Sequence, residues 1–212
     1  VILAWSKFID KIKDQYPNSR VPATLLMHTD PYDQEGPNLI AVADMLKLQD
    51  NVVFSTHRVE FEKMNVLHNI SDACINIAYA EGFGLATLES MQCGNPIIAT
   101  KTGGLTRQVV DHRDGSENGI ALDVKLKTLV GSQGVPYIYE DYVCVDEAAE
   151  AIHKIYNLSD SEASTLSEKV LSYVSSEFNH QKTIDMWHES LLNLLKSREE
   201  NKPKFWELSE IK

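Results

Sequence analysis

Residues 73–100 decide the fold, and they read Ala73-Cys-Ile-Asn-Ile-Ala-Tyr79, Ala80, Glu81-Gly-Phe-Gly-Leu-Ala-Thr-Leu-Glu89, Ser90-Met-Gln-Cys-Gly94 and Asn95-Pro-Ile-Ile-Ala-Thr100. The apolar, partly β-branched run at 73–79 predicts a buried parallel strand. From Leu85 onward apolar residues recur at every third position, which is a helical period. Gly94 is a natural helix end, and Pro96 opens the next strand. The stretch therefore predicts a strand, a glycine loop, a helix and a second strand.

The glycine loop has the composition of an anion site. Gly82 and Gly84 let the backbone turn tightly and approach a ligand without a Cβ in the way. The N–H groups of the first helical turn, at 84–87, together with the helix dipole, suit a diphosphate. Glu81 precedes the helix and Glu89 lies more than one turn into it, so two carboxylates flank the site. This pattern favours a sugar nucleotide as ligand; the alternative is an ordinary glycine turn with two solvated glutamates.

The paired glutamates, Glu81 and Glu89, enclose Gly-Phe-Gly and resemble the motif of the GT-B retaining glycosyltransferases, family 4 type. The resemblance continues through Cys93-Gly-Asn-Pro-Ile-Ile-Ala-Thr100, Gly103-Gly104 and Val109-Val-Asp111, and it extends more loosely over 1–197. It implies an α/β fold, with a Rossmann-like, mostly parallel sheet and helices on both faces. This would be the C-terminal, donor-binding half of a GT-B enzyme.

The resemblance also implies an activity. The family transfers a sugar from a nucleoside diphosphate sugar, UDP- or GDP-linked, to an acceptor hydroxyl with retention of configuration. It uses no cofactor and no metal. Glu81 would be the catalytic residue that holds donor-sugar hydroxyls, and Glu89 would hold the ribose diol. The donor-binding set implied beside Glu89 is Thr56, His57, Val59, Gly82, Phe83, Gly84, Leu85, Gly103 and Gly104.

Two positions leave alternatives open. His57 lies in the loop after the strand expected at 51–55, where ligands of such sheets bind, so this loop is a candidate neighbour of the base. The His57 side chain is equally consistent with a plain surface histidine. Thr106-Arg107 stands where the family commonly has Pro-Glu. Arg107 is expected either to contact phosphate or to pair with Asp111 four residues on.

The composition is that of a globular protein of 212 residues, with 43% hydrophobic residues and a net charge of -11. Such acidity argues against nucleic acid and anionic membranes as partners. No apolar run approaches the ~20 residues of a transmembrane helix. The three cysteines, Cys74, Cys93 and Cys144, show no metal-ligand spacing and are odd in number. They predict reduced thiols in a cytoplasmic protein.

The predicted organisation is one nucleotide-sugar-binding domain over 1–197 and a charged tail over 198–212. Within the domain we expect an irregular insertion at about 125–142 and a helical segment from about 146. The chain begins inside a predicted helix, whose apolar face comprises Ile2, Trp5, Ile9, Ile12 and Tyr16. The resemblance therefore implies that a first strand, an Arg and a Lys for the donor phosphates, and an N-terminal GT-B domain are missing. The isolated fragment is expected to be unstable or inactive.

Three other classes of protein compete with this interpretation. A GT-B sugar-nucleotide epimerase shares the fold, but we expect it to keep histidine and arginine in the cleft. A dinucleotide-binding Rossmann domain requires Gly-x-Gly-x-x-Gly, and the loop at 81–84 offers no third glycine. A non-catalytic module that binds nucleotide sugars would have the same loop. The upstream sequence would discriminate among them.

Overall fold

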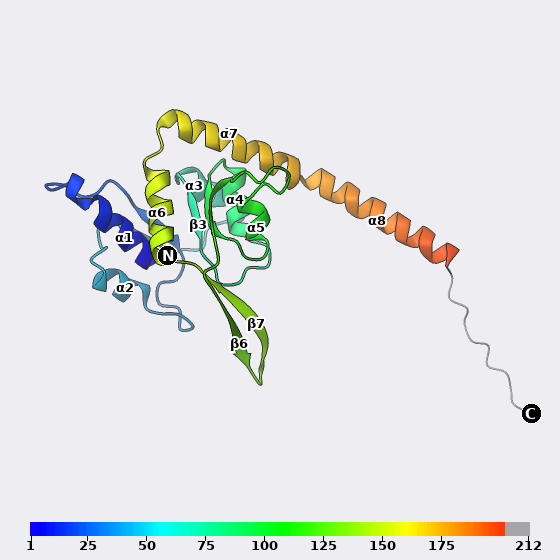
Figure 1. Cartoon of the computed structure of the whole chain (residues 1–212), viewed down its shortest axis with the longest axis horizontal. Coiled ribbons are helices and arrows are strands. Elements are labelled where there is room, and N and C mark those ends of the chain that lie inside the picture. The colour runs from blue at the N-terminus through cyan, green and yellow to red at the C-terminus, as the bar shows by residue number, and fades with distance from the viewer. Residues whose placement is uncertain (202–212) are drawn as a thin grey trace, which may run out of the picture. The chain divides into compact units, whose positions relative to one another are not determined.

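The computed structural model describes residues 1–201, and the chain forms two compact units, Val1–Ser172 and a second that begins at Tyr173. Each unit is described by itself (Figure 1). Of the predicted charged tail at 198–212, the part from 202 onward lies outside the described residues.

The strands of the first unit's body are all parallel. β1 (Leu25–His28) pairs with β2 (Val52–Ser55). β4 (Ile97–Thr100) lies between β3 (Cys74–Asn76) and β5 (Gly119–Leu122) and pairs with both. The predicted α/β class with parallel strands is confirmed. The hydrogen bonds, however, divide the described strands of this body into a two-stranded and a three-stranded sheet.

One hydrophobic core serves both sheets. Leu25 and Val52 of the first sheet belong to the same buried cluster as Ile98 and Leu122 of the second. β4 carries Ile-Ile-Ala-Thr and is buried at all four positions, as expected of a strand with neighbours on both edges and helices above and below. The carboxyl ends of β3 and β4 therefore lie side by side on a rigid base.

The helices follow the predicted apolar patterns. The described ones up to residue 177 are α1 (Ile2–Ile12), α2 (Leu39–Met45), α3 (Met64–Asn69), α4 (Leu85–Gln92), α5 (Leu105–Val109), α6 (Val145–Tyr156) and α7 (Asp160–Glu177). Short 3-10 turns at Lys13–Gln15 and Phe61–Lys63 follow α1 and precede α3. Four of the residues predicted for the α1 face are buried, and α1 lies beside α6 (Figure 1). Lys7 Nζ pairs with Asp146 Oδ1 at 2.6 Å across this contact.

The predicted insertion is an antiparallel hairpin that extends away from the rest of the first unit (Figure 1). It consists of β6 (Leu126–Ser132) and β7 (Val135–Tyr142), with a register shift between Val130 and Ser132. The strands expected to be irregular pair as one antiparallel ladder, which this shift interrupts. Its base is fixed by Tyr142, whose ring stacks on that of Tyr79 with centroids 4.3 Å apart.

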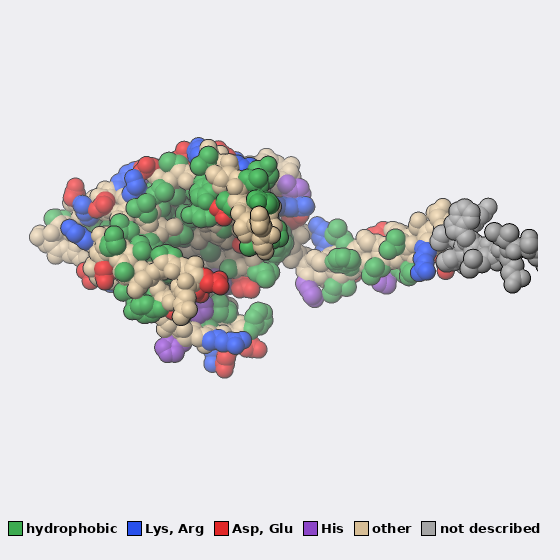
Figure 2. All heavy atoms as spheres, turned by 90° about the horizontal axis from the view of Figure 1, so that it is seen from below, with side chains coloured by type: hydrophobic (Ala, Val, Ile, Leu, Met, Phe, Trp, Pro, Cys, Tyr) green, Lys and Arg blue, Asp and Glu red, His purple; other side chains and the backbone are tan. Residues whose placement is uncertain are grey.

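Beyond Tyr173 the main element is α8 (His180–Glu200), whose first turn is capped by the Asn179 side chain. None of its described residues is buried. The apolar positions that predicted this helix are all exposed: Ile184, Trp187, Leu191 and Leu194. Figure 2 shows hydrophobic side chains on the surface along it. Among the described residues no helix combines the length and the apolar character needed to span a bilayer.

Candidate functional site

Two glycine loops meet at the carboxyl ends of β3 and β4. The Gly104 amide donates a hydrogen bond of 3.1 Å to the Gly82 carbonyl oxygen. Gly103 adopts a φ of +45°, and a Cβ at this position would clash with the Glu81 carbonyl oxygen. Only glycine fits here, because the backbones are in direct contact. The fold therefore brings the loop at 81–84 and the loop at 102–104 into one backbone surface.

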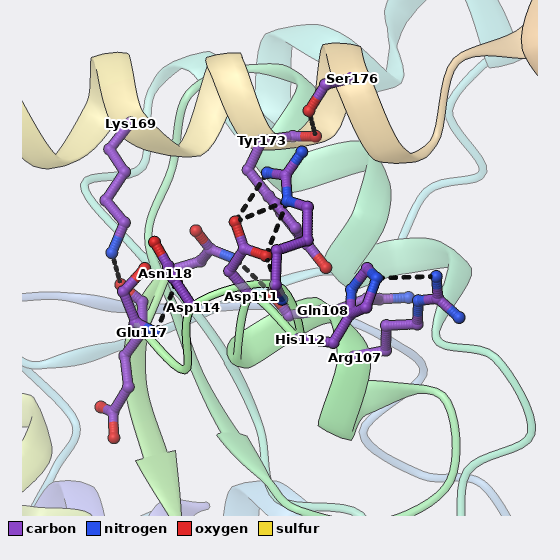
Figure 3. Close-up of polar contacts among 12 residues, drawn as sticks. Arg107, Gln108, Asp111, His112, Asp114, Glu117, Asn118, Lys169, Tyr173 and Ser176 are labelled. Atoms are coloured by element: carbon purple, nitrogen blue, oxygen red, sulfur yellow. Dashed lines mark hydrogen bonds and ion pairs between the residues drawn. The ribbon is translucent and has the colours of Figure 1, made fainter.

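A buried glutamine holds the two loops together. Gln108 Nε2 donates to the carbonyl oxygens of Phe83, at 2.6 Å, and Gly84, at 3.0 Å. Its Oε1 accepts a hydrogen bond of 2.6 Å from the Thr87 hydroxyl. The Asn118 side chain donates to the Gln108 carbonyl oxygen at 2.9 Å (Figure 3). Sequence reasoning missed Gln108 and Thr87; the one available signal was a polar residue inside an apolar stretch of a predicted helix.

The N-terminus of α4 has the geometry of an anion site. Gly84 precedes the helix with a φ of +89°, which is a left-handed conformation that favours glycine. Leu88 is the first residue of α4 whose amide bonds back along the helix, to the Gly84 carbonyl oxygen at 3.1 Å. The amides before it have no partner within the helix. Phe83 and Leu85 beside them are exposed, so this end of the helix is open to a ligand.

The two glutamates of the motif lie on either side of this helix start along the chain. Glu81 is half-buried in the loop, next to the backbone contact with Gly103. Glu89 is in the second turn of α4, and 39% of its side chain is exposed. Its Oε2 lies 3.7 Å from His68 Nε2 on α3. His68 was not among the predicted site residues, because it lies outside the motif and approaches only in the folded chain.

The loop predicted to contact the base follows β2 rather than β3 or β4. Thr56 and His57 are exposed and Val59 is half-buried. Because β2 pairs with β1, the loop lies at the end of the other sheet. Within the described residues no hydrogen bond or ion pair connects it to the glycine loops.

The hairpin adds a carboxylate beside the second glycine loop. Thr102 donates a hydrogen bond of 2.8 Å to Asp141 Oδ2, and Lys127 Nζ lies 3.1 Å from Asp141 Oδ1. The Asp141 amide donates to the Tyr79 carbonyl oxygen at 2.7 Å. The hydrogen bond from Thr102 and then that from Lys127 lower the pKa of Asp141. The hairpin base is therefore joined to the second loop and to the segment that leads into the first, which no motif indicated.

The helix after the second glycine loop is short, since α5 has five residues, and charged groups gather beyond it. Arg113 donates to both Asp111 oxygens, at 2.6–3.1 Å, and this bonding lowers the pKa of Asp111 to about 2. Arg107 Nη2 lies 3.2 Å from His112 Nε2 (Figure 3). Asp111 thus has a partner two residues away.

The described part of the chain contains no group of three or more His, Cys, Asp or Glu side chains placed to hold a metal ion. Cys74, Cys93 and Cys144 are free.

A family model described as "Glycosyl transferases group 1" matches residues 33–130, which include both glycine loops. Among curated proteins, the D-inositol 3-phosphate glycosyltransferase of Arthrobacter sp. (strain FB24) is 36% identical over 78 residues. The match covers 37% of this chain and 18% of that protein. The chain thus spans a small part of the curated relatives it matches.

Solved structures share the fold. The C-terminal domain of a group 1 family glycosyl transferase from Francisella tularensis matches with a TM-score of 0.59 and 16% identity, over 84% of this chain and 79% of that one. HepE from Anabaena, solved in complex with UDP and glucose, matches with a TM-score of 0.56 and 17% identity. This match covers 88% of this chain and 52% of that one.

Proposed function

We propose that this chain supplies the donor-binding half of a group 1 glycosyltransferase with a GT-B type of fold; the family match over 33–130 and the fold shared with the two solved structures support this. The complete enzyme transfers a sugar from a nucleoside diphosphate sugar to an acceptor hydroxyl, with retention of configuration as in family 4. The observation that carries this proposal is the backbone contact between the two glycine loops at the open N-terminus of α4. A diphosphate bound there meets several amides and the positive end of a helix dipole.

Different residues around the N-terminus of α4 bind different parts of the nucleotide-sugar donor. The amides at 84–87 donate hydrogen bonds to the diphosphate, and the exposed Phe83 and Leu85 side chains border it. Gly103 and Gly104 present backbone to the donor sugar because no side chain stands in the way. Glu81 accepts hydrogen bonds from the sugar hydroxyls, and Glu89 accepts them from the ribose diol. The loop with Thr56, His57 and Val59 serves the base; this assignment rests on its place at a strand's carboxyl end.

The reaction exchanges one bond at the anomeric carbon. The bond to the diphosphate oxygen breaks, the bond to the acceptor oxygen forms on the same face of the sugar, and the acceptor proton leaves with the nucleoside diphosphate. Charge grows on the diphosphate as its bond to the sugar breaks. Backbone amides aimed at that charge stabilise the transition state more than the bound donor.

The remaining assignments concern the protein as a whole. The donor domain comprises 1–197, and an N-terminal GT-B domain provides the acceptor site. The donor is UDP- or GDP-linked, and the HepE structure with UDP and glucose supports testing the uridine series first. The three free cysteines support a reducing compartment, the cytoplasm.

Calorimetric titration of the full-length protein tests this function. We expect saturable binding of UDP or GDP, weaker binding of the matching monophosphate, which lacks the second phosphate, and no binding of NAD. The same preparation should release the nucleoside diphosphate from a panel of UDP- and GDP-sugars when acceptor is present. Saturable NAD binding without binding of either diphosphate would refute the proposal.

A further inference from the structure

His68 has a half-buried side chain whose Nε2 atom lacks a hydrogen bond. Its side chain is 15% exposed, and Nε2 is buried without a hydrogen-bond partner among the described residues. Most buried polar atoms in folded proteins have a partner, so each exception calls for an explanation. The neighbouring acceptor is Glu89 Oε2, at 3.7 Å.

The backbone around His68 is fixed against α4. Asn95 Nδ2 donates to the His68 carbonyl oxygen at 2.7 Å and to the Ser90 hydroxyl at 3.1 Å. Asn69 Nδ2, on the next residue of α3, lies 3.8 Å from Cys93 Sγ. Two amide side chains thus connect the end of α3 to α4 and to the residues after it. The imidazole is therefore held at a set position relative to the Glu89 carboxylate.

In a hydrogen bond between His68 and Glu89, the imidazole must be the donor and the carboxylate the acceptor. An ionised carboxylate only accepts hydrogen bonds, so the facing Nε2 must carry a proton for the contact to be attractive. A rotation that shortens the 3.7 Å separation by less than an ångström gives a charge-assisted hydrogen bond. The carboxylate has two oxygens and about four lone-pair directions. One oxygen can be held by His68 while the other accepts from a ligand.

We infer that His68 is a positioning residue for Glu89: it orients the carboxylate that accepts hydrogen bonds from the ribose diol of the donor nucleotide. The inference rests on the proposed function, since it assigns Glu89 to the ribose. It predicts that the contribution of His68 to affinity depends on the ribose hydroxyls.

The test is a cycle of protein variants and ligands, measured by calorimetry on the full-length protein. UDP and GDP are titrated in parallel, and the tighter ligand is compared with its 2′,3′-dideoxy analogue. His68→Leu should weaken binding of the ribonucleotide roughly fivefold, as for the loss of one hydrogen bond, and should leave binding of the dideoxy analogue unchanged. His188→Leu, at an exposed histidine of α8, is the matched control and should alter neither.

The variant His68→Gln provides the second readout. Because glutamine keeps a neutral N–H donor, this variant should bind the ribonucleotide more tightly than His68→Leu does, and the dideoxy analogue equally well. Equal weakening of both ligands by His68→Leu, or wild-type affinity, would overturn the inference. If Glu89→Ala also binds the ribonucleotide like wild type, the ribose assignment in the proposed function falls with it.

Discussion

Replacing Glu81 and Glu89 by alanine should impair the enzyme in different ways: the first through kcat and the second through donor binding. Loss of Glu89 removes a charge-assisted hydrogen bond to the nucleotide, which is worth roughly 1.5–3 kcal/mol, or about a tenfold to 150-fold rise in donor KM and nucleoside diphosphate Kd. Loss of Glu81 should lower kcat and leave nucleoside diphosphate affinity nearly unchanged, because the nucleotide alone has no sugar to contact. Titrations and initial rates on the two full-length variants measure this. Equal weakening of nucleoside diphosphate binding would contradict the division of roles.

Gly103 should be far less tolerant of alanine than Gly134. At position 103 the new methyl group meets the Glu81 backbone and the φ of +45° is strained, so we expect a loss of about 2–5 kcal/mol of unfolding free energy. Gly134, between β6 and β7, has nothing within 4 Å of an added Cβ, and its replacement should change stability by about 0.5 kcal/mol or less. Urea unfolding of both variants provides the comparison. Similar midpoints would show that the loop backbones separate at little cost.

The site residues predicted from the sequence are those that belong to a local motif. Glu81, Glu89 and the four glycines at 82, 84, 103 and 104 could be proposed because residue type and spacing along the chain mark them, and their roles stay predictions. Gln108 and His68 were missed, since their role depends on contacts with residues 21 to 25 positions away. Asp141 is 39 positions from its partner Thr102 and lies in an insertion without a motif.

Tyr142 should stabilise the base of the β6–β7 hairpin, whereas replacing Tyr137 should hardly change the stability of the protein. Tyr142 stacks on Tyr79, and its hydroxyl donates to Glu140 at 2.5 Å, whereas Tyr137 is 64% exposed. Tyr142→Ala should therefore lower the unfolding free energy by about 1–3 kcal/mol, and Tyr137→Ala by about 0.5 kcal/mol or less. Thermal unfolding of the two variants tests this. A larger effect at Tyr137 would mean that the outer part of the hairpin is covered in the full-length protein.

Among the elements, strands and helices were predicted well where the apolar period was clear, as in α1 and β4. The pairing of the strands was harder to predict from the sequence. The division into a β1–β2 sheet and a β3–β4–β5 sheet depends on which strand edges meet in space. Phe61 and Leu85 marked helices correctly by their spacing, yet both side chains are exposed. A period locates an element, but the packing partner determines which of its apolar residues are buried.

The protein as a whole should be most stable between about pH 5 and 9. Hydrogen bonds and ion pairs lower the pKa of six carboxyl groups: Asp111, Asp114, Asp123, Asp141, Glu150 and Glu162. A lowered folded-state pKa gives stability that is present above the unfolded value, near 4, and is lost as pH falls, toward about 2 for Asp111. The urea concentration at the unfolding midpoint should decline as pH falls from about 4 toward 2, and the replacement Asp111→Asn should make this decline shallower.

At high pH the stability is limited by a group whose pKa is raised on folding, not lowered. The hydrogen bond between the Tyr16 and Tyr156 hydroxyls raises the pKa of Tyr156 to about 12. A raised folded-state pKa gives stability that is present below the unfolded value, near 10, and is lost as pH rises toward 12. Tyr156→Phe should remove this part of the alkaline decline. An unchanged profile would exclude the tyrosine pair as its origin.

The contact between Gly104 and Gly82 has an evolutionary consequence. It fixes the length of chain that leaves one loop, runs through α4 and β4, and returns at the other, because the two ends of that path touch through their backbones. An insertion or deletion within 85–102 would shift one loop against the other. Homologous genes should therefore accumulate length changes in the β6–β7 hairpin and conserve the spacing of these glycines, even where the side chains between them have diverged.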